Sequence, residues 1–253
     1  MDNLPKPSQR TIPLSEVAFG VNFVSPDFSS VKFGEFYARI KNRYPSHRDI
    51  LPIINPTPMP AFVLAPQLPR VWFEKSDRLI QLQSDRFVYN WRLLNEEKNE
   101  YPGYEQLSAE FFQEYEEFSD FSTSSLNSPM YLEEFNLTYV NHLERADGLH
   151  GSTFTFYNQS WEKNFTAPQY VSGQLVFSFE DKNVRLTMSL RPVIKIGSAQ
   201  AITQFELVAQ SISLKNAIRS PAKEWYDQAH NIIFTAWRNS INIDLINTWG
   251  IEA

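Results

Sequence analysis

Apolar and polar residues alternate with the period of a β-strand at several places along the chain. Every second residue from Val17 to Phe23 is apolar, so we expect a first strand over residues 14–24. The clearest pattern lies between residues 69 and 92, where three β-prone runs are separated by the turn residues Lys75-Ser76-Asp77 and Ser84-Asp85. This stretch predicts a three-stranded meander around which the fold is organised.

The third run of the meander, residues 86–92, sorts its side chains into two classes. Phe87, Tyr89 and Trp91 share one face at a period of two. The opposite face carries Arg86, Val88, Asn90 and Arg92. We therefore expect the aromatic face to pack in the core and the polar face to contact solvent.

Apolar residues recur every three or four positions in three other segments, which indicates helices. These segments are residues 29–44, about 104–121, and a last one from Ser220-Pro221 to Trp249. Ser29 or Ser30 is the expected cap of the first helix, and Ser220 that of the last, with Pro221 in its first turn.

A proline-rich connection and a second set of strand patterns complete the chain. Residues 45–69 hold seven of the 16 prolines, which excludes a helix or a central strand and predicts an extended connection. Beyond a loop-like segment at 122–129, strands are expected at 131–143 and at about 170–180, 184–195 and 201–214.

The order strand, connection, three-stranded meander and helix thus occurs twice. We predict an α+β fold of two similar units, residues 1–126 and 127–253. Each unit would be an antiparallel sheet with its helices packed on one face. The halves share no convincing residue-level identity, so an ancient duplication is a hypothesis.

Charge is distributed unevenly along the chain. Nine acids and one base, Lys98, lie in the segment from Glu96 to Asp120, which therefore has a charge of −8. Because the whole chain has a net charge of −6, the remaining residues sum to about +2. The protein therefore resembles a near-neutral body with one acidic segment. Nucleic acid is an open possibility as a ligand, but the charge does not indicate it.

The absence of cysteine limits the kinds of catalytic and metal site that the chain can form and bears on its cellular location. With no cysteine, disulfides, thiol catalysis and thiolate metal sites are excluded, and a cytoplasmic protein fits best. No apolar run approaches the roughly 20 residues of a membrane span, so we expect no membrane association.

Motifs for catalysis are missing from the sequence. The four histidines form no metal-binding pair, and neither a GxSxG elbow nor a glycine-rich phosphate loop occurs. Glu144, Asp147 and His150 could form a carboxylate and imidazole set, although hydrated loop side chains are the simpler explanation. We expect no enzymatic activity, no metal and no cofactor.

A carboxylate-based hydrolase is the least favoured alternative. Its candidate acids are Asp77, Asp85 and Asp147. Asp77 and Asp85 lie in predicted turns, where an aspartate side chain commonly bonds the local backbone. Structure alone therefore explains these two residues.

Two polar surfaces are candidates for binding. The first is the polar edge of the meander, Arg70, Arg86, Asn90 and Arg92, which could hold an anion or a nucleotide with Trp72 or Trp91 available for stacking. The second is the acidic helix, where Glu105, Glu110, Glu114 and Glu117 could dock a basic partner. The simpler explanations are pairing of the arginines with acids such as Glu96 or Glu97, and a solvated outer helix face.

Residues 79–118 also carry a resemblance to a known family. LIQLQSDRFVYNWR at 79–92, followed by YPGYEQLSAEFFQEYEEF at 101–118, resembles the central signature of an uncharacterised, sporadically distributed bacterial and archaeal family of about this length. EVAFGVNF and IDLINTWG lie where that family has strand and helix patterns. Patchy occurrence is typical of mobile-element and phage-defence genes, so the resemblance implies such a context, and it implies no catalytic residues.

Three functions follow in order of preference. The first is a non-enzymatic interaction subunit that holds a partner protein encoded nearby, in a phage-defence or toxin–antitoxin type operon; a homo-oligomer is also compatible with it. The second is a module that senses or binds a nucleotide or nucleic acid through the polar edge of the meander. The third is the hydrolase.

Overall fold

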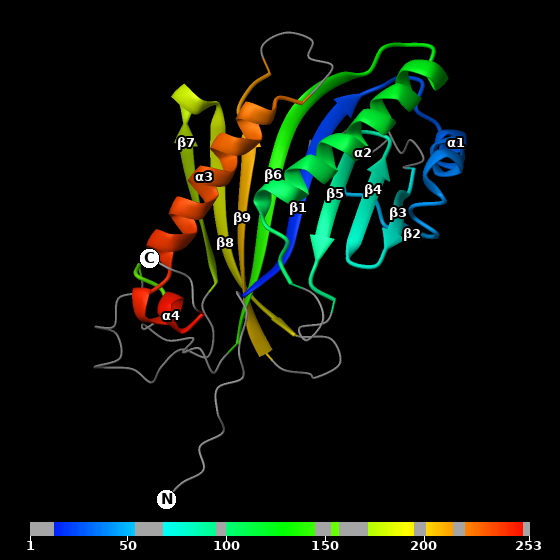
Figure 1. The fold of residues 1–253 in the computed structure, drawn as a ribbon. Helices are drawn as coiled ribbons and strands as arrows, with labels where there is room; N and C mark the ends of the chain where they lie inside the picture. Colours follow the sequence, from blue (N-terminus) through cyan, green and yellow to red (C-terminus); the bar gives the residue numbers. More distant parts are fainter. Residues whose placement is uncertain are drawn as a thin grey trace, which may run out of the picture.

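Nine strands form one antiparallel sheet in the order β2-β3-β4-β5-β1-β6-β9-β8-β7 (Figure 1). The structure is a computed structural model that describes residues 13–53, 68–94, 100–144, 153–156, 172–194, 201–214 and 221–249. The elements of the first half are β1 (Leu14–Val24), α1 (Ser30–Ile40), β2 (Ser46–Ile50), β3 (Arg70–Lys75), β4 (Arg78–Gln83), β5 (Arg86–Arg92) and α2 (Tyr104–Ser125).

The described residues of the second half add four strands to the sheet and two further helices. Its elements are β6 (Tyr131–Glu144), β7 (Gly173–Phe179), the 3₁₀ turn η3 (Glu180–Lys182), β8 (Val184–Ile194), β9 (Ala201–Ser211), α3 (Lys223–Ser240) and α4 (Ile243–Thr248). The helices α2 and α3 both cross the same face of the sheet, as Figure 1 shows. The predicted α+β class, the antiparallel sheet and the helices on one face are therefore confirmed.

The two halves of the sequence meet in the middle of the sheet. β1 pairs with β6 from Leu14 opposite Asn141 to Val24 opposite Tyr131, with shifts of register near each end. This pairing joins the strands of both halves into one sheet. Two units with a separate sheet each, the finer part of the prediction, are therefore not confirmed.

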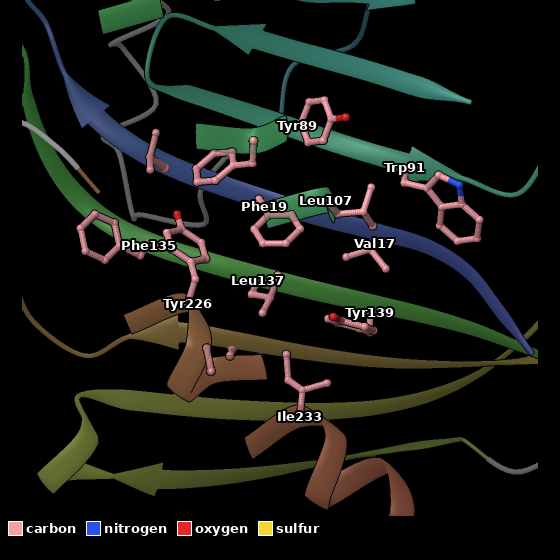
Figure 2. Close-up of a cluster of buried hydrophobic side chains, with 14 of the residues drawn as sticks. Val17, Phe19, Tyr89, Trp91, Leu107, Phe135, Leu137, Tyr139, Tyr226 and Ile233 are labelled. Carbon is pink, nitrogen blue, oxygen red and sulfur yellow. The ribbon is translucent and has the colours of Figure 1, made fainter. Parts of the chain in front are cut away.

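The core lies between the sheet and the helices α2 and α3 (Figure 2). As predicted, Phe87, Tyr89 and Trp91 are buried on this side. Aromatic rings bridge the layers, since Phe87 stacks on Phe118 of α2 with 4.9 Å between ring centroids. Offset and edge-to-face ring pairs of this kind add to the stabilisation from apolar burial.

One buried hydrogen bond connects the two ends of the described chain. The hydroxyl of Tyr226, in α3, is fully buried and donates to the carbonyl oxygen of Gly20, in β1, over 2.7 Å. Both groups would be costly to bury without a partner. The bond therefore fixes α3 against the central strand.

Four helix ends differ from the expectation, two of them in α3. α3 ends at Ser240 rather than continuing to Trp249, because Ile241 pairs with Phe154 and Asn242 caps α4 by accepting from the Asp244 amide over 3.0 Å. α3 begins after Ala222, so Pro221 precedes the helix, and Ser220 lies outside the described residues.

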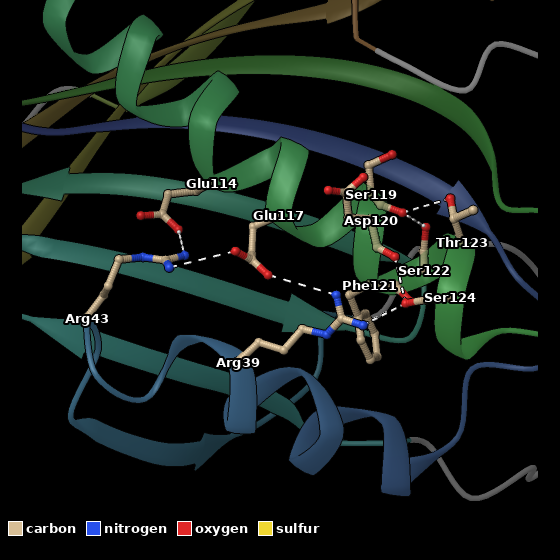
Figure 3. A network of polar contacts seen from close by, with 10 residues as sticks. All are labelled: Arg39, Arg43, Glu114, Glu117, Ser119, Asp120, Phe121, Ser122, Thr123 and Ser124. Atoms are coloured by element: carbon tan, nitrogen blue, oxygen red, sulfur yellow. Dashed lines mark hydrogen bonds and ion pairs between the residues drawn. The ribbon is translucent and has the colours of Figure 1, made fainter.

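α1 and α2 show the other two differences. Ser29 occupies the N-cap position of α1 but makes no side-chain capping bond. α2 extends to Ser125, into the expected loop, where the hydroxyls of Ser122, Thr123 and Ser124 bond carbonyls in the preceding turn (Figure 3). The proline-rich connection begins with an edge strand, β2, which pairs with β3.

Candidate binding site on the open face of the sheet

The sheet face opposite the helices forms a concavity of about 800 Å³. Alternation along each strand produces it, because residues that follow core residues by one position point to the other face. Besides the predicted residues, the polar side chains that line it include Glu16, Asn22, Glu134, Asn136, Gln204 and Glu206. We call this feature the open-face concavity.

All four residues of the predicted polar edge line the open-face concavity, namely Arg70, Arg86, Asn90 and Arg92. Two of these side chains are less exposed to solvent than expected, however. Asn90 has an exposed fraction of 1% and Arg86 of 7%. The expectation that this face simply contacts solvent is therefore wrong for these two residues, since side chains of neighbouring strands cover them.

A chain of hydrogen bonds crosses four strands on the floor of the concavity. Arg70 in β3 donates to the Gln81 side-chain oxygen in β4 over 3.0 Å, and the Gln81 amide donates to Asn90 in β5 over 2.8 Å. Asn90 in turn donates to the Glu16 carboxylate in β1. Each amide is held in one orientation by this order of donors and acceptors.

The other two arginines have carboxylate partners different from those expected. Arg92 donates to Glu74 of β3 over 2.9 Å, and Arg86 donates to Asp85 over 3.1 Å. The expected partners Glu96 and Glu97 lie outside the described residues. Asp85 therefore has a structural role in its turn.

Of the two tryptophans considered for stacking, only Trp72 lies on the polar side. The guanidinium groups of Arg48, Arg70 and Arg92 lie 4.7, 5.5 and 5.2 Å from its ring centroid. Trp91 is buried in the core, where its indole N–H donates to Asp77 over 3.1 Å. The suggestion that Trp91 could stack on a ligand at this edge is thus wrong.

Arg70 is a half-buried cation without an acidic partner in the described part of the chain. Arg70 contacts the Gln81 side chain and the Trp72 ring, and its buried Nε has no hydrogen-bond partner there. Burial and the nearby charge of Arg86 lower the pKa of Arg70, and the carboxylate charge of Glu16 opposes this shift without forming an ion pair. A buried charge is costly unless an opposite charge accompanies it, so this end of the concavity favours an anion.

The acids that line the concavity belong to three adjacent strands, Glu16 to β1, Glu134 to β6 and Glu206 to β9. Burial raises the pKa of Glu16 and of Glu134, although hydrogen bonds from Asn90 and Gln210 respectively oppose the shift. Glu16 of β1 and Glu206 of β9 both face Val140 of the intervening strand β6. The concavity therefore combines a cationic end with a middle of amides and carboxylates.

The acids of the predicted partner surface are mostly engaged within the chain. Glu114 accepts from Arg43 over 2.9 Å, and Glu117 lies 3.9 Å from Arg39 (Figure 3). Glu110 pairs with Arg78 over 2.6 Å. Glu105, the fourth acid, is exposed.

The ionisation of Glu110 follows from its partners. Burial alone would raise its pKa, but hydrogen bonds from Arg78 and Tyr89 lower the pKa to about 2. The carboxylate is thus a structural anion that holds α2 to the sheet.

The candidate hydrolase residues do not converge in the described structure. Asp77 accepts from Trp91 and pairs with Arg78 over 2.7 Å, which gives it a structural role. Asp147 and His150 lie outside the described residues, as does the side chain of Glu144. Over the described ranges, no group of three potential metal ligands occurs, and no helix is long and apolar enough to cross a membrane.

Several lining residues were missed by the sequence analysis, in particular Glu16, Gln81, Glu134 and Glu206. Glu206 alternates with the core residues Phe205 and Leu207, and Gln81 with the core residues Ile80 and Leu82, a signal that was available in the sequence. No protein-family model matches this chain, and no curated protein matches it either. The fold and site define an α+β protein with a polar concavity on an open sheet.

Proposed function

We propose that this chain is a non-enzymatic binding protein that holds a nucleotide in the open-face concavity. The observation that carries the proposal is Arg70, a half-buried guanidinium that forms no ion pair with a described residue and whose buried Nε has no hydrogen-bond partner there. A guanidinium is a planar donor fork that matches a phosphate, and such charge-assisted bonds are among the strongest in proteins. The phosphate would lie near Arg70 and Arg92.

The remaining lining supports a nucleotide over inorganic phosphate. Amides and carboxylates such as Asn136 and Glu206 can bond a base or a ribose, and the volume of about 800 Å³ exceeds that of phosphate alone. A long nucleic acid strand is less favoured, because Glu16, Glu134 and Glu206 would repel its backbone.

Calorimetric titration with a panel of mono-, di- and cyclic nucleotides, inorganic phosphate and a short single-stranded oligonucleotide tests the proposal. We expect one nucleotide class to bind, and Arg70→Gln to weaken it by about 10- to 100-fold, the equivalent of one charged hydrogen bond. Arg238→Gln, an exposed arginine on α3, is the matched control. Binding by no nucleotide, or equal affinity in Arg70→Gln and wild type, would refute this function.

The interaction subunit, the function preferred from the sequence, is our second candidate, and one strand supports it. β7 lies at an edge of the sheet, and Leu175, Val176 and Phe177 have exposed fractions of 45, 55 and 45%. Exposed apolar edge strands pair readily with other chains. A phage-defence context and a cytoplasmic location, implied by the family resemblance and the lack of cysteine, belong to this proposal.

Co-expression with the neighbouring genes, followed by size-exclusion chromatography, tests this second function. We expect co-elution with one neighbour and its loss in Val176→Lys. A chain that elutes as a monomer with every neighbour would contradict the interaction subunit without affecting the nucleotide proposal.

We also propose that the two halves are related units. Two facts support this. A long strand, three further strands and a helix follow in this order in both halves, although α1 and β2 have no described counterpart in the second half. The strand order β3-β4-β5-β1 on one side of the β1–β6 pair also matches β7-β8-β9-β6 on the other. A significant match between the halves in aligned relatives of this chain would be the test.

A further inference from the structure

A second cavity, of about 450 Å³, lies on the helical side of the sheet. It is bounded by the segment leading into α2, by α3 and by the strands β1 and β6. Its walls are mainly aromatic, with Tyr101, Tyr104, Tyr139, His230, Phe234 and Trp237 among the lining residues. We call it the aromatic cavity.

The aromatic cavity is separate from the open-face concavity. Tyr139 lines the former, whereas its neighbours in β6, Thr138 and Val140, line the latter. Successive residues of a strand point to opposite faces, so the sheet itself divides the two cavities. Each can be tested without disturbing the other.

The walls around His230 are flat and fixed. Tyr104 and His230 stack with ring centroids 4.0 Å apart and an angle of 5° between the planes. The Tyr139 hydroxyl lies 2.9 Å from His230 Nδ1, and the Tyr101 hydroxyl lies 3.4 Å from that of Tyr139. Parallel stacking and these bonds hold the rings in one arrangement.

The aromatic cavity is lined by uncharged groups. Burial lowers the pKa of His230 to about 4, so its imidazole is neutral near pH 7. The closest acid to the stack, Asp227, accepts from the Tyr104 hydroxyl over 2.8 Å and is paired with Lys223. A charged ligand would therefore find no counter-ion among the lining residues.

Two polar groups at the aromatic cavity lack partners in the described chain. The Nε2 atom of His230 makes no hydrogen bond there, since only Nδ1 is bonded. The buried indole N–H of Trp237 also has no acceptor. A buried polar group without a partner, such as the Trp237 indole N–H, is uncommon in folded proteins. His230 Nε2 is not fully buried, so a bound molecule with one polar group can reach it.

We infer that the aromatic cavity binds a small, neutral, flat molecule that is mostly apolar and carries one hydroxyl or carbonyl group. The aromatic walls match a flat ring system, and the neutral lining excludes an ionised one. The volume is in the range of small-molecule sites. His230 Nε2 is the atom that contacts the polar group.

Fluorescence titration with N-phenyl-1-naphthylamine, a neutral aromatic probe, tests the aromatic cavity directly. We expect saturable enhancement from one class of site. Phe234→Ala should lower the affinity about tenfold, the equivalent of one aromatic contact. Phe177→Ala is a matched control, because Phe234 and Phe177 are equally exposed at 45% and only Phe234 lines the cavity.

Two outcomes of that titration would overturn the inference. One is the absence of saturable binding. The other is a loss of binding in Phe177→Ala but not in Phe234→Ala, which would assign the probe to the exposed apolar residues of β7. Because Phe234 is already half exposed, its replacement should not unfold the chain, and circular dichroism checks this.

A competition experiment tests the role of His230. We expect 1-naphthol to displace the probe at lower concentration than naphthalene in the wild type, because only the naphthol has a hydroxyl. In His230→Phe, which keeps a ring next to Tyr104 but has no nitrogen, this preference should disappear. An unchanged preference in His230→Phe would contradict the assigned contact.

Discussion

The pKa of His230 differs between the folded and the unfolded chain. Its folded pKa of about 4 is below the ordinary 6.5, so between these values the unfolded chain binds a proton that the folded chain rejects. Stability should be complete above about pH 6.5 and should fall as the pH approaches 4, by up to about 3 kcal/mol. Urea unfolding across this range measures the loss.

The variant His230→Phe should lack this acid sensitivity. Glu110 provides an internal comparison, since its pKa of about 2 is depressed from 4.5. Its contribution is present above about pH 4.5 and is lost only as the pH falls toward 2. Equal slopes for wild type and His230→Phe between pH 6.5 and 4.5 would show that His230 is not buried as described.

Gly20 is required by a close contact in the open-face concavity. A Cβ atom at this position would lie 2.2 Å from the Asn136 side-chain oxygen. Gly20→Ala should therefore displace Asn136, destabilise the fold by about 1 to 3 kcal/mol and weaken ligand binding. Gly34→Ala, on α1 with no atom within 4 Å, should instead stabilise by about 0.5 to 1 kcal/mol. Denaturant unfolding compares the two, and equal effects would contradict the prediction.

At the scale of elements, α1 is held against α2 by ion pairs. Arg43 donates to Glu114, whose side chain is only 11% exposed. Arg43→Ala should leave this carboxylate without its cation and cost about 1 to 3 kcal/mol. Lys32→Ala removes an exposed pair with Glu35 within α1 and should cost at most about 0.5 kcal/mol. Thermal or urea unfolding of both variants distinguishes a structural ion pair from a solvated one.

Elements whose position is set by residues close together in the sequence could be predicted, whereas those set by contacts distant in the sequence could not. The meander was predicted within one or two residues, because its turn residues and alternation are local signals. The break after Ser240 was missed because Leu245 and Trp249 continue the apolar period of α3 beyond Ile241. Its cause is partly the pairing of Ile241 with Phe154, a contact distant in sequence.

The same distinction applies to the open-face concavity. Arg70, Arg86, Asn90 and Arg92 were selected because one meander places them together. Glu16 and Glu206 were missed because they approach this group only through β1 and β9, whose positions depend on the β1–β5 and β6–β9 pairings. Alternation identifies the face of a residue, but the order of strands decides its neighbours.

At the scale of the whole molecule, the sheet does not divide between the halves. Separation after residue 126 would expose one edge each of β1 and β6, which are paired along their length. We expect the fragments 1–126 and 127–253 to aggregate or remain unfolded alone, and the intact chain to unfold in one transition. Circular dichroism and size-exclusion chromatography of the fragments measure this. Cooperative unfolding of either fragment by itself would favour two domains.

The hydrogen bond from Tyr226 to Gly20 also sets an order of events during synthesis. Tyr226 is synthesised 206 residues after Gly20, about 10 to 40 s later at ordinary rates of elongation. Within this interval β6, the pairing partner of β1, is synthesised a little past the middle, whereas α3 follows only at the end. The contact of α3 with β1 therefore becomes possible only after the β1–β6 pair can already have formed.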